Sequence, residues 1–143
     1  MKVLLINGSP HVDGVIALAL KELSDTLNRC DIETEIIHVG NKNIRGCIAC
    51  RSCKKTGKCV FDDCVNEIAF KLKDADGLVV GAPVYYGSAN STVVSLLTRL
   101  FYSINYDLSM KVGASVVSAR RSGCTATFDE LNKFFTISGM PIV

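Results

Sequence analysis

The sequence has no surplus of charge of either sign, no long apolar run and no internal repeat. Its 16 basic and 14 acidic residues leave a net charge of +2, and the two signs are interspersed along the chain. This balance gives no basis for binding nucleic acid or a membrane surface. No apolar run approaches the ~20 residues that a membrane-spanning helix needs. These absences leave a single domain with one core over the 143 residues.

The first residues also lack a targeting signal, because the stretch Met1–Asn7 becomes polar too soon for a signal peptide. We therefore expect a cytoplasmic protein, in a compartment where unpaired thiols persist. Hydrophobic residues make up 48% of the chain, which suits a well-buried α/β protein and argues against disorder.

Strand-like and helix-like patterns alternate along the chain. Apolar runs or alternations predict strands over residues 2–7, 33–39, 77–83 and 111–118. Apolar stripes with helical spacing predict helices over 15–28, 90–103 and 124–138, and a further helix that Asp62 or Asp63 would cap. Residues 141–143 are typical of the opening of a fifth strand. The alternation predicts an α/β protein whose parallel sheet is covered on both faces, because crossovers between parallel strands are right-handed.

Ligands of such sheets bind beyond the carboxyl ends of the strands. Three of the predicted strands end in loops that can contact a ligand, at residues 8–14, 83–88 and 118–123. We therefore expect these three loops to meet at one edge of the sheet.

The first loop, Asn7-Gly8-Ser9-Pro10-His11-Val12-Asp13-Gly14, leads into a predicted helix. Free N–H groups at a helix N-terminus bind anions, and the Ser9 hydroxyl can add a hydrogen bond. The loop is neither a P-loop nor a G-x-G-x-x-G motif. A phosphate site is favoured here over a bare turn, whereas His11 taken alone is more typical of a surface residue.

The second and third loops carry aromatic and basic side chains. Tyr85 and Tyr86 follow a buried strand, where they suit a planar isoalloxazine ring; the alternative is that they pack on a neighbouring helix. Arg120 and Arg121 are placed to meet a phosphate or a carboxylate, unless they form a solvated basic turn.

Four of the seven cysteines form a C-x2-C-x2-C-x5-C run: Cys47, Cys50, Cys53 and Cys59. Four thiols on one short segment can bind an iron–sulfur cluster or a zinc ion. The bacterial ferredoxin run, C-x2-C-x2-C-x3-C-P, differs in its last spacing and in the proline, since Val60 follows here. The alternative is a segment of reduced thiols that pack as small apolar groups. A disulfide framework is disfavoured in the cytoplasm.

Together these motifs resemble the flavodoxin-like NAD(P)H-dependent FMN reductase family, and within it the iron–sulfur flavoprotein branch. The resemblance covers the whole chain and is carried by residues 6–10, 47–59 with Asp62 and Asp63, 82–88, 118–121 and 131–135. It implies one flavodoxin-like, three-layer α/β/α domain over residues 1–143, with a doubly wound parallel sheet of order 2-1-3-4-5. It further implies an oxidoreductase that binds FMN and passes electrons from NAD(P)H to flavin or to another small-molecule or protein acceptor.

The resemblance also assigns site residues. Those expected around FMN are Ser9, Pro10, His11, Gly14, Val15 and Ile16 at the phosphate, Pro83, Val84, Tyr85, Tyr86, Gly87 and Ser88 along the ring, and Ser118, Ala119, Arg120 and Arg121 on its other side. In iron–sulfur flavoproteins a run like Cys47, Cys50, Cys53 and Cys59 holds a [4Fe-4S] cluster. We nominate no acid–base residue, because FMN itself supplies the electron chemistry.

Two departures from the family pattern qualify these expectations. Val15 and Ile16 stand where the family usually has Ser, Thr or Asn, so main-chain groups and Ser9 must suffice and a reduced FMN affinity is expected. The fifth strand is incomplete in this chain, which predicts a homodimer or larger oligomer that covers the sheet edge, unless the natural product is longer. The rival functions are an electron carrier between FMN and a cluster, and a non-catalytic zinc or thiol module on a degenerate flavodoxin scaffold.

Overall fold

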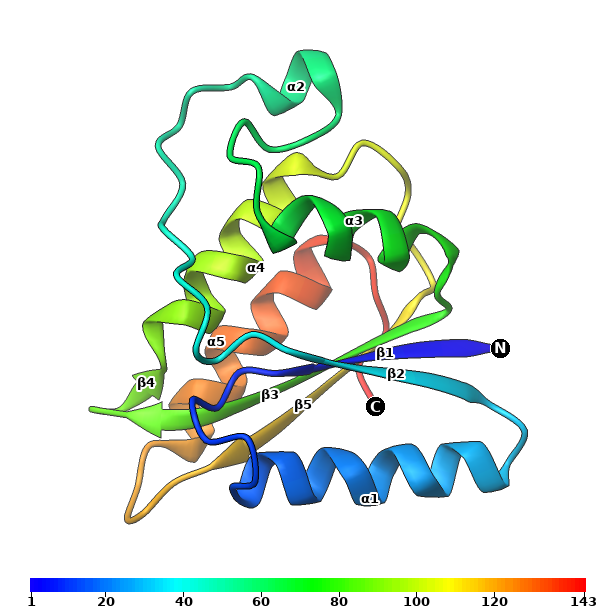
Figure 1. The fold of residues 1–143 in the computed structure, drawn as a ribbon, viewed down its shortest axis with the longest axis vertical. Coiled ribbons are helices and arrows are strands. Elements are labelled where there is room, and N and C mark those ends of the chain that lie inside the picture. Colours follow the sequence, from blue (N-terminus) through cyan, green and yellow to red (C-terminus); the bar gives the residue numbers. More distant parts are fainter.

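The computed structural model describes residues 1–143 as a parallel sheet between two layers of helices (Figure 1). The elements in chain order are β1 (Lys2–Asn7), α1 (Val15–Arg29), β2 (Glu33–His38), α2 (Cys53–Thr56), α3 (Cys64–Asp74), β3 (Gly77–Tyr85), β4 (Ser88–Ala89), α4 (Ser91–Ser103), β5 (Val112–Ser118) and α5 (Cys124–Ile137). None of the helices has both the length and the apolar character needed to cross a membrane.

The parallel strands lie in the order β2-β1-β3-β5, which confirms the predicted arrangement. The fourth predicted strand, residues 111–118, corresponds to β5. The labels differ because no periodic pattern indicated the short antiparallel β4. A single parallel bridge between Gly113 and Ile142 lies where the incomplete fifth strand was predicted.

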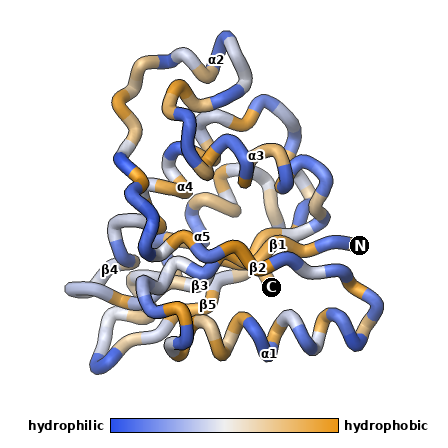
Figure 2. Tube along the Cα trace, viewed as in Figure 1, coloured by the Kyte–Doolittle hydropathy of each residue, from blue (hydrophilic) through white to orange (hydrophobic).

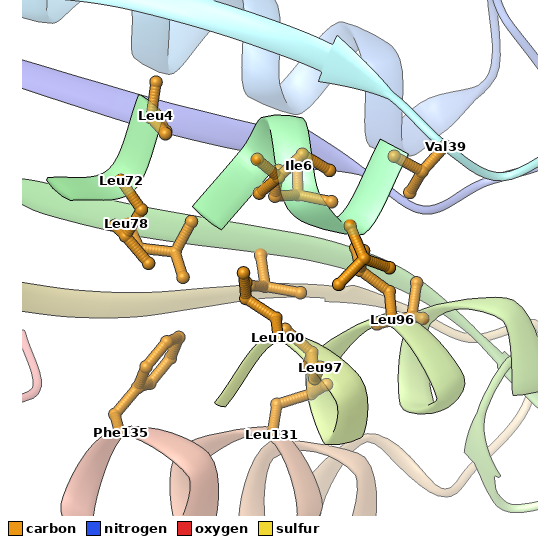
Figure 3. Close-up of a cluster of buried hydrophobic side chains, with 14 of the residues drawn as sticks. Leu4, Ile6, Val39, Leu72, Leu78, Leu96, Leu97, Leu100, Leu131 and Phe135 are labelled. Carbon is orange, nitrogen blue, oxygen red and sulfur yellow. The ribbon is translucent and has the colours of Figure 1, made fainter. Parts of the chain in front are cut away.

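Helix α1 covers one face of the sheet, and α3, α4 and α5 cover the other (Figure 1). The sheet has a hydrophobic core on each face. Residues of β1 contribute to the two cores in alternation, because successive side chains of a strand point to opposite faces. Leu4 and Ile6 belong to the large cluster under α3, α4 and α5, which Figure 3 shows in part. Leu5 belongs to a smaller cluster with Ile16 and Leu20 of α1. The three-layer α/β/α architecture predicted from the sequence is therefore present.

The cysteine segment lies outside these layers. Between β2 and α3 its only regular element is the single turn α2, and the segment passes over α3 and α4 (Figure 1). Polar and apolar residues are mixed along it, without the continuous apolar stretches of the central strands (Figure 2). The segment rejoins the fold at Asp63, whose Oδ1 accepts a hydrogen bond from Val65 N at 3.1 Å. Asp63, rather than Asp62, is therefore the N-cap of α3.

Tyr106 fastens the connection between α4 and β5 to α3. Its hydroxyl donates a 2.5 Å hydrogen bond to the carbonyl oxygen of Ala69. Burial raises the pKa of Tyr106 to about 12, and the negative charge of Asp74 adds to that effect. The phenol is therefore held in its neutral, hydrogen-bonding form in the folded chain.

We expect Tyr106→Phe to lower the free energy of unfolding by about 1 kcal/mol at neutral pH, because one hydrogen bond is lost. The stabilisation should persist below the usual tyrosine pKa of about 10 and disappear as the pH rises towards 12, since the unfolded chain releases the proton first. Urea unfolding at several pH values measures both effects. Tyr102→Phe, at an exposed position, should change stability by less than about 0.5 kcal/mol; an equal alkaline slope in wild type and Tyr106→Phe contradicts the assignment.

Candidate functional site

The main chain of the first loop is hydrogen-bonded to the middle of the sheet and to the start of α4. Gly8 N donates to Gly81 O at 2.8 Å, and Asn90 Nδ2, at the start of α4, donates to Gly8 O at 2.8 Å. A Cβ atom on Gly8 would lie 2.0 Å from Val93 Cγ2. Glycine is therefore needed here for the loop to pack against α4.

Local hydrogen bonds shape the rest of this loop around Ser9. Asn7 Oδ1 accepts from Ser9 N at 3.0 Å, and Ser9 Oγ accepts from His11 N at 3.2 Å. His38, at the end of β2, donates from Nε2 to Ser9 O at 2.8 Å. Ser9 is consequently buried, while Pro10 is half-buried and His11 is exposed. The sequence analysis did not identify His38, because its contact lies 29 residues away along the chain.

Helix α1 begins at this loop without a side-chain cap. Its N-cap, Gly14, is extended, and no acidic residue lies in the first turn. The N–H groups of that turn, at the positive end of the helix dipole, can therefore bind an anion. Val15 is exposed, whereas Ile16 is buried against Leu5, so Ile16 can offer only its main chain to a ligand.

The second loop is a hairpin. β3 continues through Tyr85, and a two-residue turn at Tyr86 and Gly87 connects it to β4. Both turn residues have positive φ, 55° and 87°, as a type I′ turn requires. Tyrosine is strained in that region, and Tyr86 is nevertheless fully exposed. The alternative that Tyr86 packs on a neighbouring helix is wrong.

Glu130 of α5 holds this hairpin in place. Its Oε2 accepts a 2.6 Å hydrogen bond from Ser88 Oγ and a 2.9 Å bond from Ala89 N. Hydrogen bonds to a charged acceptor are stronger than neutral ones. The sequence analysis missed Glu130, because its partners are more than 40 residues distant in the chain.

The third loop lies against the second. A Cβ atom on Gly123 would come within 2.9 Å of Val84 Cγ1 and 3.1 Å of Gly87 Cα. Ser118 and Ala119 are half-buried, whereas Arg120 and Arg121 are exposed and form no ion pair. The three predicted loops thus lie at the carboxyl edge of the sheet, where the third loop also carries two exposed arginines that form no ion pair.

All four cysteines of the run line one cavity of about 400 Å³. Phe61, Arg99 and Tyr102 complete much of its wall, and no residue of the three strand-end loops reaches it. The cysteines are unpaired; Cys47 and Cys50 are exposed, and Cys53 and Cys59 are half-buried. No three potential ligands surround a single point in the way one metal ion requires.

Cys59 is held more firmly than the other three. Its backbone is bonded on both sides by the Asn66 side chain, which accepts from Cys59 N at 2.8 Å and donates to Cys59 O at 3.1 Å. Its sulfur accepts hydrogen bonds from Nε and Nη2 of Arg99, both at 3.2 Å.

The Arg99 side chain is completely buried and forms a two-bond pair with Asp63, at 2.6 and 2.9 Å. Burial lowers the pKa of the guanidinium, but its hydrogen bonds to Asp63 and Cys59 more than offset this effect and leave the pKa raised. In the sequence, Arg99 is the single arginine of a predicted helix that is otherwise largely apolar. No periodic pattern singles it out, because one arginine within an apolar stripe does not indicate its partners.

The remaining cysteines lie outside the cavity. Burial raises the pKa of the Cys64 thiol, and the negative charge of Asp63 raises it further. This thiol therefore stays protonated near neutral pH.

Comparison with known proteins agrees with this geometry. The family model for NADPH-dependent FMN reductase matches residues 1–143. An iron–sulfur flavoprotein of Methanocaldococcus jannaschii is 37% identical over 146 residues, covering 100% of this chain and 76% of that protein.

Solved structures show the fold. An NAD(P)H:quinone oxidoreductase from Methanothermobacter marburgensis superposes with a TM-score of 0.78 at 14% identity, covering 100% of this chain and 80% of the other. A flavodoxin from the Archaea gives 0.69 at 14% identity, with 100% and 78% coverage. The predicted flavodoxin-like fold is thus confirmed.

We expect Glu130→Ala to lower the free energy of unfolding by about 1–3 kcal/mol, because the Ser88 hydroxyl and the Ala89 N–H both lose their acceptor. Urea unfolding measures the change. Asp129→Ala, which removes an exposed carboxylate from the adjacent position, is the matched control. Equal stability of the two variants would show that the hairpin does not depend on Glu130.

Proposed function

The chain belongs to the NADPH-dependent FMN reductase family, and we propose that it binds FMN and transfers electrons from NAD(P)H to flavin or to another acceptor. The observation that carries this proposal is that three loops, distant in sequence, follow the neighbouring strands β1, β3 and β5 at the carboxyl edge of the sheet, with the third packed on the second. Ligands of open parallel sheets bind at that edge. The acceptor is a small molecule or a protein that can approach the exposed hairpin.

The first loop and α1 suit the FMN phosphate. The uncapped first turn of α1 offers N–H groups, and Ser9 Oγ, which already accepts from His11 N, retains its own hydrogen to donate. Arg120 and Arg121 add positive charge that no carboxylate of this chain neutralises. The residues present therefore fit an anionic ligand, although hydrophobic Val15 and Ile16 add no side-chain hydrogen bond.

The hairpin suits the planar ring. When bound, FMN would supply the hydride and electron chemistry. Tyr85 and Tyr86 present aromatic surface, and the main chain of residues 83–88 can hydrogen-bond to the edge of the ring. Glu130 holds the hairpin from behind, so the aromatic surface is positioned before the ligand arrives.

The cysteine cavity favours a second cofactor, a [4Fe-4S] cluster held by Cys47, Cys50, Cys53 and Cys59. All four thiols are unpaired and line the same cavity, so the donor set fits. Zinc gathers four sulfurs at about 2.3 Å from one centre, whereas each thiolate of a four-iron cluster binds a different iron. The relative of Methanocaldococcus jannaschii is an iron–sulfur flavoprotein, and this favours the cluster over zinc. When bound, the cluster would supply one-electron chemistry in addition to that of the flavin, as in an iron–sulfur electron carrier.

Tyr86→Asn separates ligand binding from stability. Asparagine relieves the strained turn, since Asn-Gly is preferred in type I′ turns, so thermal stability should be kept or raised. Loss of the aromatic contact should weaken FMN binding about tenfold. Titration of apoprotein into FMN, followed by flavin fluorescence, measures the affinity.

Tyr102→Ala, an exposed tyrosine on α4, is the control and should bind FMN as wild type does. If FMN fluorescence is not quenched by wild type even at ~100 μM, well above the ~1 μM range of ordinary cofactor affinities, the flavin site is wrong. Wild-type affinity in Tyr86→Asn would remove Tyr86 from that site.

Anaerobic reconstitution should give about four irons per chain if the cluster is [4Fe-4S]. Replacing Cys47, Cys50, Cys53 and Cys59 together by serine should abolish iron binding, as measured by iron analysis and visible absorption. The triple serine variant of Cys30, Cys64 and Cys124 is the control, because these cysteines lie outside the cavity. One zinc per chain instead of iron would support the zinc module, and iron retained by the quadruple variant would exclude these ligands.

A further inference from the structure

Arg99 is a buried charged side chain, and it lies outside the three loops that we propose bind FMN. A buried ion is costly unless its hydrogen bonds are satisfied. Asp63 balances the charge of Arg99 through Nη1 and Nη2, and Arg45 O accepts a further bond from Nη1 at 3.3 Å. The donors that remain, Nε and the second N–H of Nη2, are aimed at Cys59 Sγ.

This arrangement makes Cys59 unlike the other cysteines of the cavity. Two 3.2 Å N–H···S hydrogen bonds and the Asn66 side chain hold it before any metal is present. The sulfur of Cys47 accepts only from Ala49 N, in its own loop, at 3.4 Å. No hydrogen bond reaches the sulfur of Cys50 or Cys53.

The Asp63 pair also fixes the direction of these donors. A guanidinium is a planar fork, so two bonds to one carboxylate determine where its remaining N–H groups point. The Arg99 guanidinium also lies over the Phe61 ring, 4.9 Å from its centroid. The carboxylate of Asp63 and the ring of Phe61 therefore hold the guanidinium, and its remaining N–H donors stay directed at Cys59 Sγ.

We propose that Arg99 is a positioning residue for the iron–sulfur site, which holds Cys59 as a preformed ligand and raises the reduction potential of the cluster. The proposal rests on the cluster proposed above. Reduction adds one electron and makes the cluster more negative, and N–H donors to a ligand sulfur stabilise that form. Because Asp63 offsets the charge of Arg99, the hydrogen bonds carry the effect.

The test compares Arg99→Lys with Arg45→Lys. Both variants keep the positive charge, but only the first removes the fork that bonds to Cys59; the Arg45 side chain lies over Phe61, 4.6 Å from its centroid, without touching a sulfur. Reconstituted proteins are titrated with dithionite, and electron paramagnetic resonance reports the reduced fraction. We expect Arg99→Lys to disfavour reduction at least tenfold, which is ~59 mV for a one-electron couple, and Arg45→Lys to match wild type.

The outcomes are distinct. Equal potentials in the two variants, with equal iron content, overturn the role of Arg99 and leave the cluster intact. A wild-type chain that takes up no iron overturns the cluster itself, and this role with it. An Arg99→Lys chain that melts as wild type does but fails to retain iron supports the positioning of Cys59.

If Arg99→Lys does not fold, a second measurement uses the reconstituted, reduced wild-type chain labelled with 15N-arginine. Pulsed electron paramagnetic resonance should show coupling of the cluster to guanidinium 15N, because two Arg99 nitrogens donate to Cys59 Sγ. Arg45→Lys should keep this coupling. Absence of the coupling in the wild type overturns the proposal.

Discussion

The buried pair between Arg99 and Asp63 is the interaction on which the irregular part of this molecule depends. The segment between β2 and α3 has only one helical turn of regular structure, and few of its side chains enter the core. Its attachment is instead polar. Arg99 of α4 donates hydrogen bonds to Asp63, the N-cap of α3, and to two groups of the segment, Arg45 O and Cys59 Sγ. Removing one partner of such a pair leaves an uncompensated buried charge, so loss of one of these contacts should destabilise the attachment of the whole segment.

The carboxyl edge of the sheet, proposed to bind FMN, is built differently, from the regular geometry of the sheet. Parallel strands bring their carboxyl ends to one side, and the loops that follow are then neighbours whatever their separation in sequence. Glu130 of α5 fixes the conformation of one of these loops, because its carboxylate accepts hydrogen bonds from the strained hairpin. The strain at Tyr86 is confined to one exposed residue, which is typical of positions kept for binding rather than for stability.

The elements of the fold could be predicted because they depend on local periodicity. Apolar runs and helical stripes identified the four long strands and the helices α1, α4 and α5, with ends within about two residues, and they indicated α3 without its end. Alternation predicted a parallel sheet, but the order of its strands came from the family resemblance. The short β4 was missed because Tyr86-Gly87 lacks the usual Asn-Gly signal of a hairpin.

Glu130 and the bonds of Arg99 were missed because their partners are 36 to 54 residues away, where no pattern reaches. The FMN contacts, the cluster ligands and the homodimer stay predictions. The cysteine cavity and the three loops share no lining residue, and the hairpin is fixed by Glu130 of α5 whereas Cys59 is fixed by Arg99 of α4. Helix α4 contacts both sites, but through opposite ends, because Asn90 at its start binds the first loop. Regions with different supports can open at different free energies, so the cysteine segment can move while the sheet edge stays closed. For the proposed cluster, Cys59, already fixed by Arg99 and Asn66, would be the starting ligand onto which the exposed Cys47 and Cys50 close, and its assembly would then follow an order.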